Sequence, residues 1–353
     1  MSINKTPVGV MLVNFGVPEN VDPKTVGKFM RSYVADGRVF GFFGLMLHDI
    51  LHWTRRKTIE MESTARYADL YDGDHFPYTN TSARLRRKVE ERLEKMGADN
   101  AEVVMAFRYG EPSMRDGFRQ LEDLGCKRIV VMPLYPQSSY EFTASVHDEL
   151  SREQRGFTRG MEFRFVDNFY KDPLYVKAVA RKIREHVDVD GGDDKIVFAY
   201  RAIPLRDILH GDSYELQTSA TALAIANELG LERRRWTISY IPYSHLDDYD
   251  TLKPDIDETV ERFALGKVRH VAVVCPGQVV DSVDTLYEID ERMRQRFESR
   301  FAGSYAKCRF TFVPALGDDD LFVDALARII LGNMDGWESH YCAGVGGRVG
   351  RED

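Results

Sequence analysis

Short, strongly apolar runs alternate with longer amphipathic patterns along this chain, and the alternation constrains the fold more than any other feature. The apolar runs are nearly continuous, which is typical of strands buried on both faces of a sheet. They lie at residues 8–14, 102–107, 128–132, 195–199, 236–241, 270–275 and 309–313. Helical patterns separate them at residues 81–96, 113–124, 173–187, 213–229, 256–265 and 283–300. This order predicts an α/β fold in which helices flank parallel sheets.

One local plan occurs twice in the sequence. Residues 124–128 (LGCKR) and residues 265–270 (LGKVRH) each precede an apolar run that ends in a proline-containing loop. We therefore predict two similar Rossmann-like domains, formed by residues 1–172 and residues 173–353. Four glycines stand where helix C-termini are expected: Gly97, Gly125, Gly230 and Gly266.

The loops after the predicted strands define where a ligand would bind. Parallel strands place their carboxyl ends along one edge of a sheet, and open α/β folds bind ligands there. The sequence therefore predicts an interdomain cleft surrounded by residues 14–18, 133–143, 200–205 and 276–284.

Composition excludes several classes of protein. The net charge of −8 argues against general nucleic-acid binding, which requires a basic surface. The four cysteines are dispersed, and only Cys342 lies near the carboxyl terminus, so we expect no iron–sulfur cluster. The amino terminus lacks the shape of a signal peptide, and no run reaches the roughly 18 apolar residues of a membrane span. These features favour a cytoplasmic protein, either a monomer or a homodimer.

Residues 39–57 combine apolar and basic side chains and form a separate segment of the first domain. We interpret the segment as an amphipathic helix that packs on the core or forms the lip of a pocket. The alternative is peripheral membrane contact, in which Arg55, Arg56 and Lys57 meet anionic headgroups. At the other end of the chain, residues 342–353 have the composition of a flexible tail.

Six motifs at the predicted cleft resemble those of the ferrochelatase family, whose members insert ferrous iron into a porphyrin. In chain order they are LVNFGVP at 12–18, FRYGEPS at 107–113, PLYPQSS at 133–139, GDSYELQTSAT at 211–221, PGQVVDSVDTLYE at 276–288 and PAL at 314–316. The resemblance runs from about residue 8 to residue 330. It implies two similar α/β domains with the tetrapyrrole held between them.

Three motifs depart from the family pattern, and all three fall at the cleft. The family's histidine position is Arg201, and its glutamate position is Asp284. The family's glutamine-serine-arginine loop corresponds to residues 243–245, and its later tryptophan corresponds to Thr251. Because the scaffold motifs are retained while the cleft differs, the pattern indicates an altered function.

Arg201 changes the chemistry that the resemblance implies. Metallation removes two pyrrole protons and brings a dication to the centre of the ring. Histidine titrates near neutrality and can bind a metal, whereas arginine, with a pKa above about 12, offers no lone pair. We expect Arg201 either to pair with Asp284 and close the centre, or to stack on the macrocycle or bind a propionate. Should the alignment be shifted, His210 or His245 would be the histidine in the site.

The resemblance also implies roles for other residues. Arg201, Asp284 and Glu288 occupy the catalytic positions, and Asp281, Glu288 and His245 are the candidate metal ligands. The candidate porphyrin-binding residues are Phe15, Tyr135, Gln137, Ser138, Thr143, Tyr200, Pro204 and Pro276.

Two functions follow from these expectations. The first is a porphyrin- or haem-binding protein of tetrapyrrole metabolism whose metal insertion is lost or strongly reduced. The second is an active chelatase that inserts Fe²⁺ or another divalent metal with rearranged groups: Asp284, Glu288 and His245. A third interpretation is a chelatase that inserts cobalt or nickel. Arg201 argues against it as much as against iron insertion, because those relatives also depend on a histidine. We expect no covalently bound cofactor.

Overall fold

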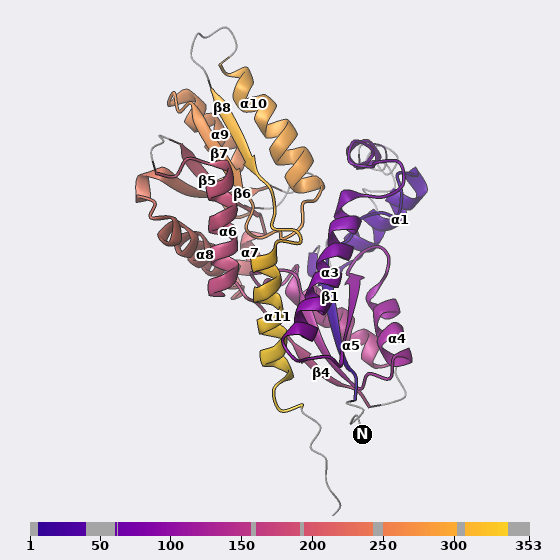
Figure 1. The fold of residues 1–353 in the computed structure, drawn as a ribbon. Helices are drawn as coiled ribbons and strands as arrows, with labels where there is room; N and C mark the ends of the chain where they lie inside the picture. Colours follow the sequence, from indigo (N-terminus) through magenta and orange to yellow (C-terminus); the bar gives the residue numbers. More distant parts are fainter. Residues whose placement is uncertain are drawn as a thin grey trace, which may run out of the picture.

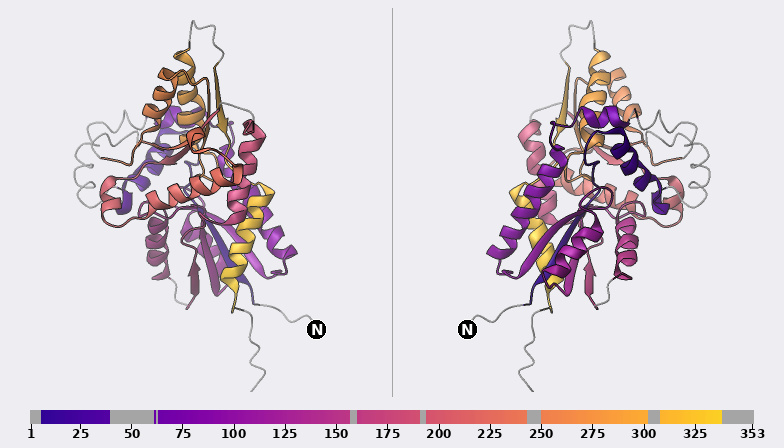
Figure 2. Two further views of the ribbon diagram at one scale, coloured as in Figure 1. Left: turned by 90° about the vertical axis from the view of Figure 1, so that its left-hand side faces the viewer. Right: turned by 90° about the vertical axis from the view of Figure 1, so that its right-hand side faces the viewer.

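A computed structural model shows two four-stranded parallel sheets, each covered by helices (Figures 1 and 2). It describes residues 6–39, 61, 63–156, 160–190, 194–242, 250–301 and 308–337. The first sheet contains β1 (Val8–Asn14), β2 (Ala101–Phe107), β3 (Arg128–Pro133) and β4 (Glu162–Phe165) in the order β2-β1-β3-β4. The second contains β5 (Lys195–Arg201), β6 (Trp236–Ile241), β7 (His270–Val274) and β8 (Arg309–Val313) in the order β6-β5-β7-β8. The strand order is the same in both sheets, which confirms the prediction of two similar α/β halves.

The central strands β1 and β5 are nearly continuous apolar runs in the sequence because they are buried on both faces of their sheets. All seven residues of β1 are buried, because helices cover both faces of the sheet. β1 pairs in parallel with β2 on one side and β3 on the other, with Val8 opposite Ala101 and Arg128. The same arrangement around β5 places the carboxyl ends of β1, β3, β5 and β7 near the junction of the halves.

The described part of the chain has helices at all six predicted ranges, together with four helices and the strand β4 that were not predicted. The helices are α1 (Pro23–Val34), α3 (Pro77–Lys95), α4 (Met114–Asp123), α5 (Thr143–Gln154), α6 (Pro173–His186), α7 (Leu205–Leu209), α8 (Tyr214–Leu229), α9 (Ile256–Leu265), α10 (Arg294–Ser299) and α11 (Asp320–Met334). A 3₁₀ turn, η1 (Arg233–Arg235), precedes β6, and a π-helix, η2 (Asp284–Met293), continues into α10. The single helix predicted at residues 283–300 is therefore a π-helix followed by an α-helix.

Three of the four predicted C-terminal glycines have the left-handed backbone that ends a helix. Gly97, Gly125 and Gly230 have φ values of 95°, 81° and 68°. Gly266 is the C-cap of α9, as predicted, but with a different backbone conformation. Gly266 has φ −76°, and the left-handed residue is Lys267 at φ 58°. The helix therefore ends at Gly266, and the left-handed residue follows one position later.

The last helix joins the two halves. α11 packs on α3 and β3 of the first half and on α6 of the second, and Figure 1 shows it running beside the first sheet. The Arg164 guanidinium donates to the carbonyls of Asn333 and Asp335, both at 2.6 Å, and lies 4.3 Å from the Trp337 ring centroid. The carboxyl end of the described chain is thereby fixed to β4.

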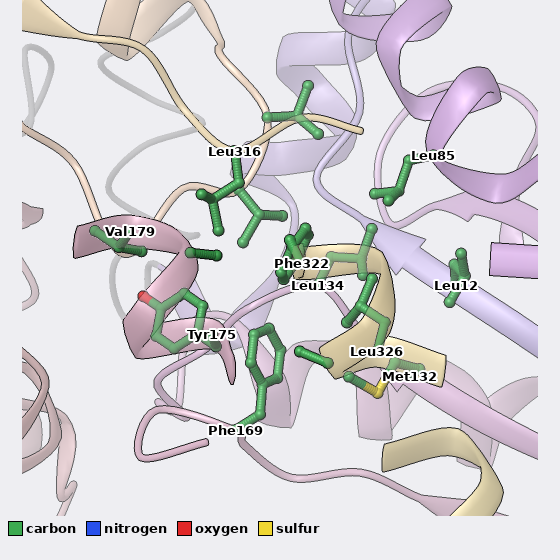
Figure 3. Close-up of a cluster of buried hydrophobic side chains, with 14 of the residues drawn as sticks. Leu12, Leu85, Met132, Leu134, Phe169, Tyr175, Val179, Leu316, Phe322 and Leu326 are labelled. Carbon is green, nitrogen blue, oxygen red and sulfur yellow. The ribbon is translucent and has the colours of Figure 1, made fainter. Parts of the chain in front are cut away.

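A hydrophobic cluster fills the junction beside α11 (Figure 3). Phe322 and Leu326 of α11 meet Leu134 from the first half and Tyr175 of α6 there, and Phe322 is fully buried. The aromatic rings of Phe322 and Tyr175 lie 6.4 Å apart. This shared core sets the relative position of the two sheets.

Some sequence predictions fall outside the described residues. They concern residues 40–57 of the lip segment, His245 and the tail at 342–353. None of the helices in the described ranges is long and apolar enough to cross a membrane.

Candidate functional site

A cavity of about 160 Å³ lies between the two halves, at the carboxyl ends of the central strands. The first half contributes the loop after β1, part of α1 and the loop after β3. The second half contributes the end of β5 and the start of η2. The lining is largely apolar and aromatic, including Phe15, Phe29, Phe142 and six tyrosines: Tyr33, Tyr67, Tyr78, Tyr135, Tyr200 and Tyr214.

Arg201, the last residue of β5, lines this cavity. Its Nη1 donates to Asp284 Oδ2 at 3.0 Å, and its Nη2 donates to Tyr33 Oη at 2.7 Å. Asp284 begins η2 in the same half, whereas Tyr33 comes from α1 in the other half. The guanidinium therefore bridges the cleft and has a fixed orientation.

Aromatic rings surround the same guanidinium. The Arg201 Cζ lies 5.3 Å from the ring centroid of Phe15, 5.5 Å from that of Tyr33 and 5.9 Å from that of Phe142. Phe15, Tyr33 and Tyr109 also contact one another edge to face, with centroids 5.0–5.2 Å apart. These contacts add cation–π attraction to the ion pair and form an apolar floor.

The guanidinium of Arg201 stays protonated and positively charged. Burial by itself lowers the pKa of the guanidinium, but Tyr33, Asp284 and Glu141 act against it, and the resulting pKa lies above the usual value. Arg201 is therefore a permanent cation that cannot take a proton from a ligand.

Glu141 is a second ionisable group beside Arg201, and sequence reasoning missed it. It lies in the loop between β3 and α5 and is almost fully buried, and neither carboxyl oxygen has a hydrogen-bond partner within the described ranges. Burial raises its pKa well above the ordinary value, although Arg201 lowers it. Its only signal in the sequence is an acidic residue between two aromatic ones, Tyr140 and Phe142.

The acidic residues of η2 are held by arginines. Glu288 pairs with Arg66 at 3.0 Å across the cleft and with Arg292 at 2.6 Å along the helix. Arg292 also makes two bonds to Asp257, of 3.0 and 3.1 Å. The carboxylate of Glu288 is thus neutralised from both sides.

The carboxylate of Asp281 holds two segments of the backbone together. It accepts a bond from Thr285 Oγ1 at 3.0 Å and from the backbone N–H of Ala315 at 3.1 Å. Burial raises the pKa of this carboxyl to about 6. It fixes the turn before η2 to the exit of β8.

Side chains of α8 hold the loop after β3. Gln137 Nε2 donates to Thr221 Oγ1 at 2.9 Å, and Ser138 exchanges two bonds with Gln217, of 2.8 and 2.9 Å. Because the loop belongs to the first half and α8 to the second, these bonds lock the base of the cleft.

A buried acid orients the FRYG motif. Asp36, which follows α1, accepts bonds from Arg108 at 2.6 Å, from Tyr109 at 2.7 Å and from Ser145. Sequence reasoning did not single out Asp36, because nothing in its neighbourhood indicates burial. The network supports Tyr109 beneath Phe15.

Comparisons with known proteins identify the family of this chain. The family model described as Ferrochelatase matches residues 7–334. The chain belongs to the ferrochelatase family. It is 32% identical to the ferrochelatase of Hydrogenovibrio crunogenus over 338 residues, covering 94% of this chain and 86% of the relative. It is 31% identical to that of Thioalkalivibrio sulfidiphilus over 334 residues, covering 94% and 88%.

Solved structures share the fold of this ferrochelatase-family chain. SirB from Bacillus subtilis with Fe³⁺ matches with a TM-score of 0.56 at 10% identity, over 93% of this chain and 95% of that one. The sirohydrochlorin chelatase SirB of Bacillus subtilis subspecies spizizenii in complex with cobalt matches with a TM-score of 0.52 at 12% identity, over the same shares. At these identities the likeness supports the two-domain architecture alone.

The fold brings seven of the family-derived site residues together and leaves five away from the cavity wall. Lining it are Phe15, Tyr135, Gln137, Tyr200, Arg201, Asp284 and Glu288. Ser138, Thr143, Pro204, Pro276 and Asp281 do not line it. Pro204 precedes α7, Thr143 begins α5, and the Pro276 carbonyl accepts a bond from Tyr175 at 2.7 Å. Of the two alternative histidines, His210 ends α7, and His245 lies outside the described residues.

The ferrochelatase-family site also lacks a preformed metal-binding group in the part of the chain that the structure describes. No three His, Cys, Asp or Glu side chains there are grouped as metal ligands would be. Of the two outcomes expected for Arg201, the structure shows the pairing with Asp284 at 3.0 Å.

Proposed function

We propose that this ferrochelatase-family chain binds a porphyrin or haem non-covalently in its cleft, and that it inserts metal slowly or not at all. The observation that carries the proposal is that Arg201 bridges Asp284 and Tyr33. The motif resemblance assigns Arg201 to the position of the family's histidine. A flat aromatic ligand suits the apolar floor of Phe15 and its neighbours.

Arg201 obstructs both steps of metallation. It cannot remove a pyrrole proton, and it has no lone pair for a metal. A unit positive charge about 4 Å from a guanidinium is repelled by about 4 kcal/mol at the dielectric of a protein surface, and a dication by about twice that. Asp284 offsets part of this repulsion, but its carboxylate is then occupied by Arg201.

Glu288 supports the same conclusion. An acidic helix could attract an incoming cation, but here Arg66 and Arg292 neutralise Glu288, and Arg292 also neutralises Asp257. Metal delivery along η2 would require these ion pairs to break, which costs several kcal/mol for partly buried groups.

Anaerobic absorbance titration tests the proposal. Purified protein is titrated with protoporphyrin, coproporphyrin and haem, and then Fe²⁺ or Zn²⁺ is added to the porphyrin complexes. We expect spectral shifts at micromolar ligand, and no metalloporphyrin above the rate without protein. The proposal fails if none of the three ligands binds, or if metal enters at an enzymatic rate.

The second candidate function is an active chelatase, which the 31–32% identity to curated ferrochelatases favours. Asp284 and Glu288 would then handle protons and metal, together with His245. Under this alternative, Glu288→Ala loses most of the metallation rate while porphyrin still binds. Retention of the full rate by Glu288→Ala contradicts this version of the chemistry.

A further inference from the structure

The cavity is small for the ligand that the proposed function assigns to it. Its volume is about 160 Å³, whereas pockets that hold ligands of drug size usually measure about 300–1,000 Å³. A tetrapyrrole macrocycle lies towards the large end of that class. The lining residues come from both halves of the chain. Binding therefore requires the walls of the cavity to separate, and the contacts that join them to change.

An ion pair crosses the cleft within the cavity lining. Arg66 Nη1 lies 3.0 Å from Glu288 Oε1, and both residues line the cavity. Arg66 belongs to the first half of the chain and Glu288 to the second. By contrast, the pair of Arg201 with Asp284 lies entirely within the second half. The Arg66–Glu288 pair is therefore a contact that must lengthen when the walls separate.

On the first half, a short helical segment at residues 63–68 carries Arg66. The next residue, Tyr67, anchors this segment, because its ring centroid lies 5.9 Å from that of Phe29 in α1. Arg66 itself reaches the second half, where its Cζ also lies 5.6 Å from the ring centroid of Tyr287. The segment is thus packed on one half and tied to the other by the Arg66 side chain.

The second half holds Glu288 independently of Arg66. Glu288 Oε2 accepts a bond of 2.6 Å from Arg292 Nε, and Arg292 is bonded in turn to Asp257 of α9. The carboxylate therefore keeps a guanidinium partner when Arg66 moves away. The side chains of Arg66 and Glu288 are 28% and 13% exposed, so water also reaches the separated groups. Opening this pair consequently costs less than breaking a fully buried one.

We propose that the Arg66–Glu288 pair is a latch that keeps the cavity closed in the free protein and opens when a tetrapyrrole binds. This inference rests on the proposed tetrapyrrole binding and adds a conformational step to it. The free protein is then distributed between a closed state, in which the pair is formed, and an open state that accepts the ligand. Because only the open state is competent, the latch weakens the apparent affinity by the factor that the closed population imposes.

Two substitutions that change the net charge in opposite directions separate a latch from simple charge attraction. Arg66→Gln removes a positive charge and Glu288→Gln removes a negative one, yet each breaks the pair. A porphyrin with peripheral carboxylates is anionic, so attraction alone predicts weaker binding by Arg66→Gln and tighter binding by Glu288→Gln. The latch predicts faster association and tighter binding in both, by about three- to tenfold, with no further gain in the double variant.

The test uses metal-free coproporphyrin, so that no metal chemistry enters the result. Stopped-flow fluorescence measures the association rate, equilibrium titration measures the affinity, and circular dichroism confirms that each variant is folded. The control is Asp318→Asn, which removes a pair with Arg84 that also joins the two halves, at 3.4 Å, but outside the cavity lining. We expect this control to leave the association rate and the affinity unchanged.

The possible results separate the latch from the binding function. Stronger binding by both single variants, with no added gain in the double variant, supports the latch. The inference is overturned if the two substitutions shift the affinity in opposite directions, weaken it or leave it unchanged, or if Asp318→Asn strengthens binding equally. The proposed tetrapyrrole binding survives all of those results. If native protein and every variant fail to bind porphyrin, the proposed function and the inference fall together.

Discussion

Arg201 determines the chemistry of this site at the scale of single residues. The sequence alone predicted its place at the cleft, and pairing with Asp284 was one of the two contacts expected for it, because both residues occupy positions fixed by motifs. It did not predict Tyr33 as the second partner or Glu141 as a buried neighbour, since both contacts form between segments that are distant in sequence. The electrostatic environment of such a residue depends on groups that are close in space but distant in sequence. A local sequence pattern does not reveal those groups.

The Arg201–Asp284 pair should contribute measurably to stability. Asp284→Asn removes the negative charge and leaves a largely buried guanidinium without its counter-charge, so we expect a loss of about 1–2 kcal/mol in the free energy of unfolding. Urea unfolding measures it. Asp148→Asn is the control, because it breaks an exposed pair with Arg38 and should cost less than about 1 kcal/mol. Equal losses in the two variants would show that the cleft pair is no stronger than a surface pair.

Asp281 should make stability depend on pH. Its folded-state pKa of about 6 lies above the ordinary value of 3.8. The folded state therefore holds the proton more tightly, and the contribution of this group to stability falls as pH rises from about 4 to about 6. Relative to Asp281→Asn, the native protein should lose up to about 3 kcal/mol across that window. A stability difference that stays constant between pH 4 and pH 7 contradicts this assignment.

At the scale of elements, the buried strands and the longer helices between them were predictable from the sequence, because burial on both faces and glycine at helix ends leave strong local signals. Strand β4 and the helices α1, α5, α7 and α11 were not predicted. The π-helix was not predicted. The resemblance had grouped Asp281 and Glu288 as candidate metal ligands. The structure begins η2 at Asp284, so Asp281 lies before the helix and turns towards Thr285 and Ala315.

Helix α4 offers a test of local structure. Ser113 and Asp116 form a reciprocal capping box at its amino terminus. Ser113→Ala removes the side-chain acceptor and should lower the free energy of unfolding by about 1 kcal/mol. Ser151→Ala, within α5, should be neutral because alanine favours a helix interior. A neutral Ser113→Ala in thermal or urea unfolding would show that the cap contributes nothing.

At the scale of the whole molecule, the duplicated strand order was anticipated by the repeated sequence plan, whereas the course of α11 was not. The sequence predicted no helix at residues 320–334, so neither α11 nor its packing partners were expected. α11 follows β8 in sequence, yet it packs on α3 and β3 of the first half. The cleft residues keep their positions because this helix and the bonds from α8 to the loop after β3 hold the halves together.

The shared core around α11 should make the chain unfold as a unit. Phe322→Ala removes a fully buried ring from the junction and should cost about 3–5 kcal/mol. Leu216→Ala, at an exposed position of α8, should change stability by less than about 0.5 kcal/mol. Circular dichroism and tryptophan fluorescence should report one shifted transition for Phe322→Ala. Two separate transitions, with only one of them shifted, would show that the halves are stable independently.

The central claim is that Arg201 and its pairing with Asp284 prevent metal insertion in a cleft that otherwise retains the family's architecture. The most direct measurement is the initial rate of metalloporphyrin formation by native protein, by Arg201→His and by the double variant Arg201→His, Asp284→Glu, at equal occupancy with porphyrin. The account predicts a background rate for native protein and an increase of at least tenfold in the variants. A native rate equal to or above those of the variants would contradict it and identify this chain as a chelatase that works with an arginine in its centre.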